Sequence, residues 1–435
     1  MSEQHSTLLS GAMTRRRMLQ GSALTGVAAF LAACGTAAQS VAPSVAASAA
    51  ASAAASAAAS AAASAATSTA PSEAPVASPA ASATPKPSPA AELNFANWPL
   101  YIDQDESNPP KSPTLDGFTT KYGTKVNYRE SISANEDFFG TIRPALQAGQ
   151  DTGWDLVVLT DWMAAKVIAL GWTETLDTAN TPNFVANESD NLRNQPWDPD
   201  NNKRAPWQSG MTGLGFDTEV VGDQTAMTAL WQPDPRWKGK VWLLNEMRDT
   251  IGLTLLMLGK DPATSTNADC DAAIAEIKKA VDAGIVRSFL GNDYKEGLIK
   301  GDLVLGTAWS GDIIQAQLEK ASLKFNIPTE GGMLWTDNML IPKGAAHKYT
   351  AELMIDYVYD PEVAAQIAAY VQYVSPVKGC KEAIARNADK DIAALAENTL
   401  MFPDAATLAK THISKALSVD EDTYFNDQFS TLQGN

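Results

Sequence analysis

The sequence predicts an α/β protein with two lobes, each built on a mainly parallel sheet flanked by helices. Short apolar or β-branched runs alternate with longer helical segments, and the stretches between the runs are long enough for crossover connections. The part of the chain with a folding composition, residues 93–435, spans about 340 residues. That length exceeds one ordinary hydrophobic core, so we expect two lobes.

The composition excludes several function classes. The chain of 435 residues carries 33 Lys and Arg against 50 Asp and Glu, a net charge of −17. Because affinity for phosphate backbones comes from clustered Lys and Arg, we expect neither nucleic acid nor an anionic membrane surface as a partner. Only 3 His are present, which disfavours enzymes that use a histidine base or a histidine-bound metal. No cofactor and no metal site are predicted.

Residues 1–33 have the features of a cleaved export signal. Arginines at 15–17 precede an apolar run over 23–33 that is too short to span a bilayer. The paired arginines resemble a twin-arginine signal, and Leu31-Ala32-Ala33-Cys34-Gly35 resembles the lipobox of bacterial lipoproteins. We expect the mature protein to begin at a lipidated Cys34, outside the cytoplasm, in the periplasm or on the outer face of the cell membrane.

Residues 34–92 are almost entirely Ala, Ser, Pro, Thr and Val. Without aromatic or large aliphatic side chains, this stretch cannot offset the entropy of folding, so it is predicted to be a tether.

The folded part should begin with a strand, and strands and helices should alternate from there. Ligands in parallel α/β sheets bind at the carboxyl ends of strands, so the residues that follow each strand are the candidates for a site. The expected strands cover 93–98, 125–128, 155–159 and 303–308, and the expected helices cover 114–122, 163–170, 269–283 and 311–320.

Tryptophans recur at these strand ends, and three of them have an Asp within three residues. Any single tryptophan is equally well explained as a core residue. The tryptophans and acids taken together favour a ligand that is cationic at points and apolar between them. Aromatic faces attract ammonium groups and cover methylenes, and carboxylates accept charge-assisted hydrogen bonds. The candidates are Trp98 and Tyr101, Thr160, Asp161 and Trp162, Trp309 and Asp312, and Trp335 and Asp337.

Five segments occur in an order that resembles a known family. They are residues 97–102 (NWPLYI), 154–158 (WDLVV), 309–312 (WSGD), 330–337 (EGGMLWTD) and 401–404 (MFPD). Together they resemble the bacterial spermidine/putrescine-binding proteins of ABC transporters, from about residue 93 to Asp404. The resemblance implies a type II periplasmic-binding-protein fold, a hinge crossed by extended segments, closure of the lobes on a polyamine, and docking on permease subunits.

The resemblance also implies binding roles for particular residues. From the residues alone, a role for Glu246 and Asp249 as capping, solvated acids at a helix start explains them nearly as well as contact with a ligand. Trp98 and Tyr101 match the family's first-lobe aromatic wall, and Thr160 and Trp162 match its Ser and Tyr after the third strand. Glu246 and Asp249 match the two acids that bind amino groups, and Trp309 matches the Trp that stacks on the ligand. Asp312 matches the acid of putrescine-preferring members, and Trp335 with Asp337 matches the pair of an aromatic residue and an acid that binds an amine.

Some residues depart from the family pattern. Asp161 is an added acid, Pro99 and Leu100 replace a small hydroxyl residue, and Ser414 stands where the family can offer a Gln. An extra acid suits a shorter or more highly charged cation, whereas a bulkier pocket favours another amine, so the identity of the amine stays open.

The predicted organisation combines these features in a monomer. Its segments are the signal (1–33), the tether (34–92), lobe 1 (93–210), lobe 2 (211–334), the return to lobe 1 (335–375) and a C-terminal segment that packs mainly on lobe 2 (376–435).

Other classes fit the sequence less well. No G-x-S-x-G, H-E-x-x-H or C-x-x-C motif is present, and the glycines at 213 and 215 lack the partners of a phosphate loop, so we expect no enzyme. The rivals are a binding protein of the same fold for another organic amine or a sugar, and a structural surface lipoprotein without a small ligand. Cys270 and Cys380 fit either a disulfide or two separate buried thiols.

Overall fold

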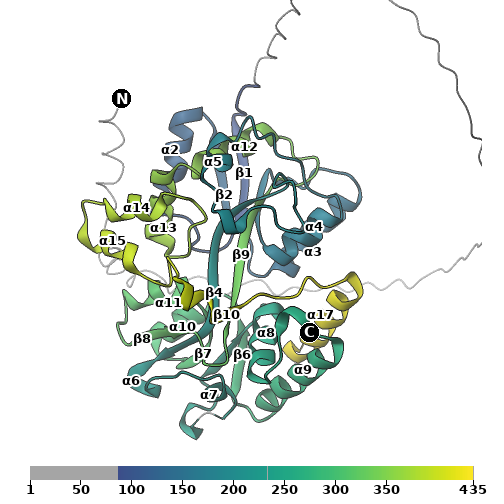
Figure 1. Cartoon of the computed structure of the whole chain (residues 1–435), viewed down its shortest axis with the longest axis vertical. Helices are drawn as coiled ribbons and strands as arrows, with labels where there is room; N and C mark the ends of the chain where they lie inside the picture. The colour runs from purple at the N-terminus through teal and green to yellow at the C-terminus, as the bar shows by residue number, and fades with distance from the viewer. Residues whose placement is uncertain (1–86, 233, 435) are drawn as a thin grey trace, which may run out of the picture. The chain divides into compact units, whose positions relative to one another are not determined.

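The computed structural model describes residues 87–434 apart from residue 233, and these residues form one compact mixed α/β unit. The strands form a sheet in the order β2-β1-β3-β9-β4-β7-β5-β6, with β10 beside β9 and β8 beside β4 (Figure 1). The strands are β1 (Glu92–Asn97), β2 (Lys125–Glu130), β3 (Leu156–Thr160), β4 (Ala205–Asp217), β5 (Val241–Leu244), β6 (Val286–Leu290), β7 (Leu305–Trp309), β8 (Leu323–Asn326), β9 (Gly332–Leu340) and β10 (Thr411–His412).

The α-helices cover the sheet. Every strand and helix expected from the sequence is present, with ends that differ by no more than three residues. The helices are α2 (Pro113–Tyr122), α3 (Asn135–Gln147), α4 (Asp161–Ala169), α5 (Pro182–Asn187), α6 (Thr218–Val221), α7 (Thr228–Trp231), α8 (Met247–Met257), α9 (Asn267–Asp282), α10 (Tyr294–Lys300), α11 (Ser310–Gln317), α12 (Lys348–Val358), α13 (Pro361–Val371), α14 (Cys380–Ala385), α15 (Lys390–Ala394), α16 (Ala405–Leu408) and α17 (Val419–Gln433).

The sheet has two parallel parts, which define the two halves of the unit. In the first half β1 pairs in parallel with β2 and β3, and helices α2, α3, α4, α12 and α13 accompany them. In the second half β5 pairs in parallel with β6 and β7, accompanied by α8, α9, α10, α11 and α17. β1 and β3 are parallel neighbours because crossover segments that contain α2 and α3 connect them, as expected for strand-helix alternation.

Two long strands cross between the halves. β4 is buried along all 13 of its residues and pairs antiparallel with β7 on one side and, along its other side, first with β9 and then with β8. β9 pairs antiparallel with β3, and both long strands run from one half to the other in Figure 1. Neither strand is among those predicted by residue range, although the family resemblance implies extended segments that cross the hinge. In β4, glycines at 210, 213 and 215 interrupt the apolar pattern.

The C-terminal residues divide between the halves. Helices α14 and α15 lie beside α13 of the first half, whereas α17 packs against α8 and α9 of the second. At the other end, the backbone N–H of Ala90 donates to Thr350 Oγ1 at 2.8 Å, so ordered contacts begin two residues before the predicted end of the tether. The predicted lobe boundaries stay predictions.

Helix α17 also reaches the first half through a group of polar side chains that we call the α17 cluster: Glu136, Lys166, Arg248, Asp422 and Asn426. Lys166 Nζ lies 2.7 Å from Asp422 Oδ2 and 3.2 Å from Glu136 Oε1. Asn426 Nδ2 donates to Glu136 Oε1 at 3.2 Å, and Arg248 Nη2 lies 2.7 Å from Asp422 Oδ1. These contacts join α3 and α4 of the first half to α8 and α17 of the second.

The two remaining cysteines answer the question left open by the sequence. Cys270 on α9 and Cys380 at the start of α14 are both free and buried. Burial raises the pKa of each thiol to about 12. The interpretation as two separate buried thiols is therefore confirmed, and the raised pKa disfavours the reactive thiolate form of both.

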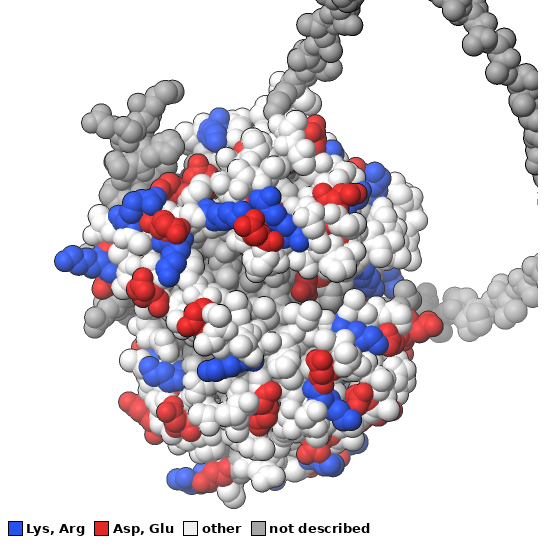
Figure 2. Space-filling view, in the orientation of Figure 1, with Lys and Arg blue, Asp and Glu red and all other residues white. Residues whose placement is uncertain are grey.

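Acidic and basic side chains are interspersed over the face shown in Figure 2. Within the described part of the chain, no helix has the length and apolarity needed to cross a membrane. The predicted signal, the lipidation site Cys34 and the tether up to residue 86 lie outside the described residues.

Candidate functional site

One pocket brings the predicted site residues together. It encloses about 650 Å³ of space between atoms, part of which is open to solvent, and all eleven predicted residues line it. Most of the predicted side chains come from strand ends and helix starts of both halves, as the strand-end argument predicts. Trp335 and Asp337 differ, because they lie in the middle of the long strand β9 (Gly332–Leu340). The lining residues are Trp98, Pro99, Tyr101, Thr160, Asp161, Trp162, Glu246, Arg248, Asp249, Asn292, Trp309, Asp312, Met333, Leu334, Trp335, Asp337, Tyr373 and Ser414.

Four of the five acids in the pocket stand at helix starts. Glu246 is the N-cap residue of α8 and Asp249 lies in its first turn, Asp161 opens α4, and Asp312 lies in the first turn of α11. The helix dipole stabilises negative charge at this position. The structural and the functional explanations of Glu246 and Asp249 are therefore compatible, because both acids are at a helix start and in the pocket.

Asp337 on β9 accepts hydrogen bonds from residues of the first half. The Tyr101 hydroxyl donates to Oδ2 at 2.9 Å, and the Thr160 hydroxyl donates to Oδ1 at 2.8 Å. Burial raises the pKa of Asp337 to about 7, which outweighs the lowering effect of these two bonds. The carboxyl group thus has two neutral donors and can still take a cation.

Asp249 is held in the same way by the second half and the crossing strands. Trp309 Nε1 donates to Oδ2 at 2.9 Å, and the Thr212 hydroxyl donates to Oδ1 at 2.8 Å. Trp335 Nε1 donates to the same Thr212 oxygen at 3.0 Å. Burial raises the pKa of Asp249 to about 6.

Asp312 accepts three hydrogen bonds from neutral groups. Oδ2 accepts from the Tyr294 hydroxyl at 2.9 Å and from Asn292 Nδ2 at 3.0 Å, and Oδ1 accepts from the Tyr373 hydroxyl at 3.1 Å. Tyr373, which donates to Asp312, and Tyr101, which donates to Asp337, contact one another edge to face, with ring centroids 5.2 Å apart.

Glu246 connects the pocket to a helix of the opposite half. Helix α3 has Ala134 at its N-cap, which offers no side-chain acceptor, and Glu246 Oε1 accepts from the backbone N–H of Asn135 at 2.8 Å. Asn135 Nδ2 in turn donates to Thr160 Oγ1 at 2.8 Å, which leads to Asp337. Burial raises the pKa of Glu246 to about 8.

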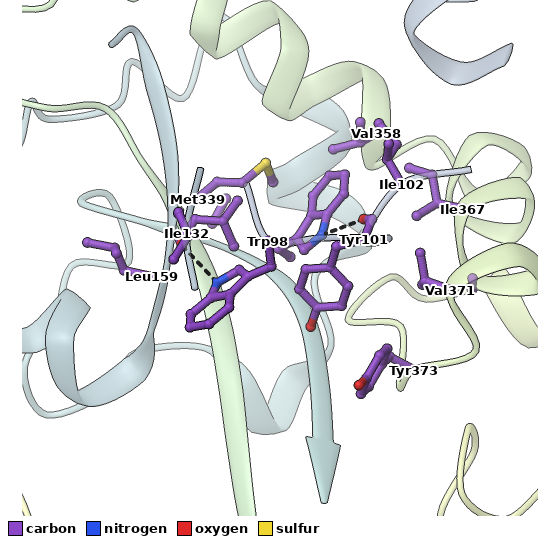
Figure 3. Packing of buried hydrophobic residues seen from close by; sticks show 14 of the residues in the cluster. Trp98, Tyr101, Ile102, Ile132, Leu159, Met339, Val358, Ile367, Val371 and Tyr373 are labelled. Carbon is purple, nitrogen blue, oxygen red and sulfur yellow. Dashed lines mark hydrogen bonds between the residues drawn. The ribbon is translucent and has the colours of Figure 1, made fainter. Parts of the chain in front are cut away.

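Aromatic rings from both halves form the remaining wall. Trp98 of the first half and Trp309 of the second meet edge to face, with centroids 6.4 Å apart. Figure 3 shows Trp98 packed near Ile132, Leu159 and Met339, with Tyr101 and Tyr373 beside one another. Trp98 Nε1 donates to the Val158 carbonyl at 3.2 Å, a bond drawn in that view. The rings therefore offer faces and edges to a ligand.

Arg248 is not among the site residues predicted from the sequence, although it lies in the chain between two predicted acids, Glu246 and Asp249. Its guanidinium carbon lies 4.6 Å from the Trp162 ring centroid, and its Nη1 donates to the Lys415 carbonyl at 2.9 Å. Next to Trp162, Asp161 Oδ1 accepts from the Trp162 backbone N–H at 2.7 Å, and burial raises the pKa of Asp161 to about 6.

Two further residues of the pocket were also not predicted. Tyr373 follows α13 and no strand, so the strand-end argument does not include it, and Asn292 lies in the loop between β6 and α10. Ser414, noted in the sequence as a departure from the family pattern, does line the pocket.

Comparisons with known proteins give the family. The model of the bacterial extracellular solute-binding protein family matches residues 152–411, more than half of the chain. The spermidine/putrescine-binding periplasmic protein of Escherichia coli K12 is 27% identical over 338 residues, which cover 76% of this chain and 90% of that protein. The putrescine-binding periplasmic protein PotF of the same organism is 27% identical over 335 residues, covering 73% of this chain and 85% of that protein.

Solved structures agree on the architecture. The spermidine/putrescine ABC transporter substrate-binding protein PotD of Streptococcus pneumoniae superposes with a TM-score of 0.62 at 23% identity, covering 79% of this chain and 99% of that one. The Tp0655 (TpPotD) lipoprotein of Treponema pallidum gives a TM-score of 0.65 at 18% identity, covering 79% of this chain and 100% of that one. The predicted two-lobed periplasmic-binding-protein fold is confirmed. Because the family model matches more than half of its length, the chain belongs to the bacterial extracellular solute-binding protein family, whose members are solute-binding proteins and not enzymes.

Proposed function

We propose that this protein captures polyamines, putrescine or spermidine, in the pocket between its lobes and delivers them to the permease of an ABC importer. The observation that carries the proposal is the convergence of five carboxyl groups and four indoles from both halves on one pocket, to which the described residues contribute a single Arg and no Lys. Such a site complements a chain of ammonium groups joined by methylenes.

The ammonium groups would pair with Asp312, Asp337 and one or both of Glu246 and Asp249. These acids accept hydrogen bonds from neutral donors, so a bound cation need not break an existing ion pair. The indoles of Trp98, Trp309 and Trp335 would cover the methylenes, with Trp162 at the wall. Binding favours the closed form by the difference in affinity between the open and closed forms.

Isothermal titration calorimetry of the purified protein with putrescine, spermidine, spermine and a panel of neutral sugars tests the proposal. We expect micromolar or tighter binding of at least one amine, and weaker binding at high salt. Silence toward the amines together with binding of a sugar would overturn the ligand class, and silence toward every compound would favour a structural surface lipoprotein.

We also propose that Cys34 is lipidated and anchors the exported protein to the cell membrane. The lipobox-like residues 31–35 and the apolar run before them support this. Metabolic labelling with an alkyne fatty acid should mark the protein and should not mark the Cys34→Ser variant. Equal labelling of both would contradict the anchor.

A further inference from the structure

Arg248 is a cation built into an acidic pocket. Among the pocket-lining residues of the described chain it is the only Lys or Arg, and it is 8% exposed. A guanidinium at this depth bears on which amines the pocket accepts, because its positive charge repels ligand ammonium groups nearby and its contact with Trp162 covers a ring that a ligand could otherwise use.

The position of Arg248 is fixed from outside the pocket. Its Nη2 lies 2.7 Å from Asp422 Oδ1 and its Nη1 donates to the Lys415 carbonyl at 2.9 Å, both beyond the pocket lining. Asp422 is itself held by Lys166 at 2.7 Å. The guanidinium is thus restrained by charge-assisted bonds and stays in place when a ligand enters.

Within the pocket Arg248 covers an aromatic ring. Its guanidinium carbon lies 4.6 Å from the centroid of Trp162, within cation–π range. Asp161 precedes Trp162 and also lines the pocket; burial raises the pKa of this acid to about 6, and Arg248 is one of the charges that lower it. A cation of the protein therefore already occupies the face of Trp162.

We propose that Arg248 is a specificity-determining residue that covers the face of Trp162 and places a fixed positive charge in the pocket wall, so that the pocket binds diamines and triamines more tightly than the tetraamine spermine. This inference rests on the proposed function. Three acids each accept a hydrogen bond from an aromatic side chain and so combine a carboxylate with a ring, namely Asp249, Asp312 and Asp337, whereas Glu246 accepts from Asn135. A fourth ammonium group would lie next to the guanidinium, where like charges repel.

The experiment compares amine preference with and without this charge. The double variant Arg248→Met/Asp422→Asn replaces the buried ion pair by a neutral pair of similar size, which avoids an unpaired buried charge. Calorimetry at pH 8 with putrescine, spermidine and spermine should show that wild-type protein binds spermine at least tenfold more weakly than the better of the other two. In the double variant, the ratio of spermine to putrescine affinity should rise at least tenfold.

One matched variant retains the cation. For Arg248→Lys we expect the affinity ratio to stay within threefold of wild type, with folding checked by circular dichroism and thermal unfolding. If the double variant does not fold, Arg248→Gln takes its place. A ratio that does not change on loss of the charge, or wild-type protein that binds spermine as tightly as putrescine, would overturn the inference and leave the proposed function intact, whereas absence of binding of all three amines would overturn both.

Discussion

Asp337 is the acid whose loss should be felt most directly in ligand binding. It is 4% exposed and accepts hydrogen bonds from Tyr101 and Thr160. Asn has the same shape and can accept one of these bonds, so we expect Asp337→Asn to fold normally but to bind putrescine or spermidine at least tenfold more weakly, the loss of one buried charge-assisted contact. Calorimetry at pH 8 measures the change.

Asp302→Asn provides the matched control for Asp337→Asn. Asp302 is exposed and does not line the pocket, so this variant changes the net charge equally without touching the site. We expect its affinity to stay within twofold of wild type. Equal effects of the two variants would attribute the loss to long-range charge and remove Asp337 from the binding site.

The raised pKa values of the pocket acids predict that amine affinity depends on pH. The pKa is about 6 for Asp161 and Asp249, about 7 for Asp337 and about 8 for Glu246. Below these values the acids are protonated, and a bound ammonium group favours the charged form, so binding releases protons. Affinity for putrescine should therefore increase as pH rises from 6 to 8, while its primary ammonium groups, which have a pKa of about 10 like that of Lys, stay charged.

Calorimetry at pH 7 in buffers with different ionisation enthalpies measures this proton release directly. We expect the apparent binding enthalpy to change with the buffer in the sense of protons leaving the protein. A binding enthalpy that is independent of the buffer, with the same affinity at pH 6 and 8, would show that the acids are already ionised before binding.

At the scale of elements, the pairing of β4 with β9 positions Trp335 through a glycine. Gly210 lies opposite Trp335 in the register, and a Cβ at this position would come within 2.4 Å of the indole and 2.9 Å of the Tyr373 ring. We expect Gly210→Ala to displace both rings and to weaken amine binding roughly tenfold, since both rings belong to the pocket wall.

Gly140→Ala is the control for Gly210→Ala. Gly140 lies within α3, and a Cβ there has no neighbour within 4 Å. This variant should keep its affinity and unfold at a slightly higher temperature, because Ala is favoured over Gly in helices. Calorimetry and thermal unfolding of both variants separate a local effect on the pocket from a general effect of the methyl group.

At the scale of the whole molecule, the α17 cluster should set how readily the two halves part. Lys166→Met removes the cation that links α4 to Asp422 and Glu136. We expect amine dissociation to become roughly threefold to tenfold faster, the effect of one partly exposed ion pair. Stopped-flow displacement with tryptophan fluorescence measures the rate.

Lys378→Met removes an ion pair that does not join the halves. Lys378 Nζ lies 2.6 Å from Asp190 Oδ1 at an exposed position near the first-half helices α5 and α14. Its dissociation rate should equal that of wild type. If Lys166→Met behaves in the same way, the α17 cluster has no part in opening.

Much of the fold and of the pocket could be predicted from the sequence, because local signals carry them. Apolar runs such as residues 156–159 indicate buried strands, and the ends of those strands hold Thr160, Asp161 and Trp162. The parallel arrangement then requires residues from separate strand ends to converge. The predicted residues that follow β1, β3, β5 and β7 line the pocket for this reason, whereas Trp335 and Asp337 reach it from the middle of the antiparallel strand β9.

The residues that were not predicted depend on contacts between distant parts of the chain. Arg248 is held by Asp422, 174 positions away. A prediction based on charge alone does not place a basic residue among the acids of a cation-binding pocket. Tyr373 reaches Asp312 from a segment after α13 that has no strand pattern. Strand β4 owes its burial to neighbours on both sides, which outweigh its interrupting glycines.

The hydrogen bonds made by the aromatic groups of the pocket restrict ligands by a criterion other than charge. The indoles of Trp98, Trp309 and Trp335 and the hydroxyls of Tyr101 and Tyr373 all donate to protein acceptors. A sugar hydroxyl or a carboxylate that needs a donor from these groups must break such a bond and leave a buried acceptor unpaired, at a cost of about 1 to 3 kcal/mol each. An ammonium group only donates, so it can bind the lone pairs that remain while every existing bond stays intact.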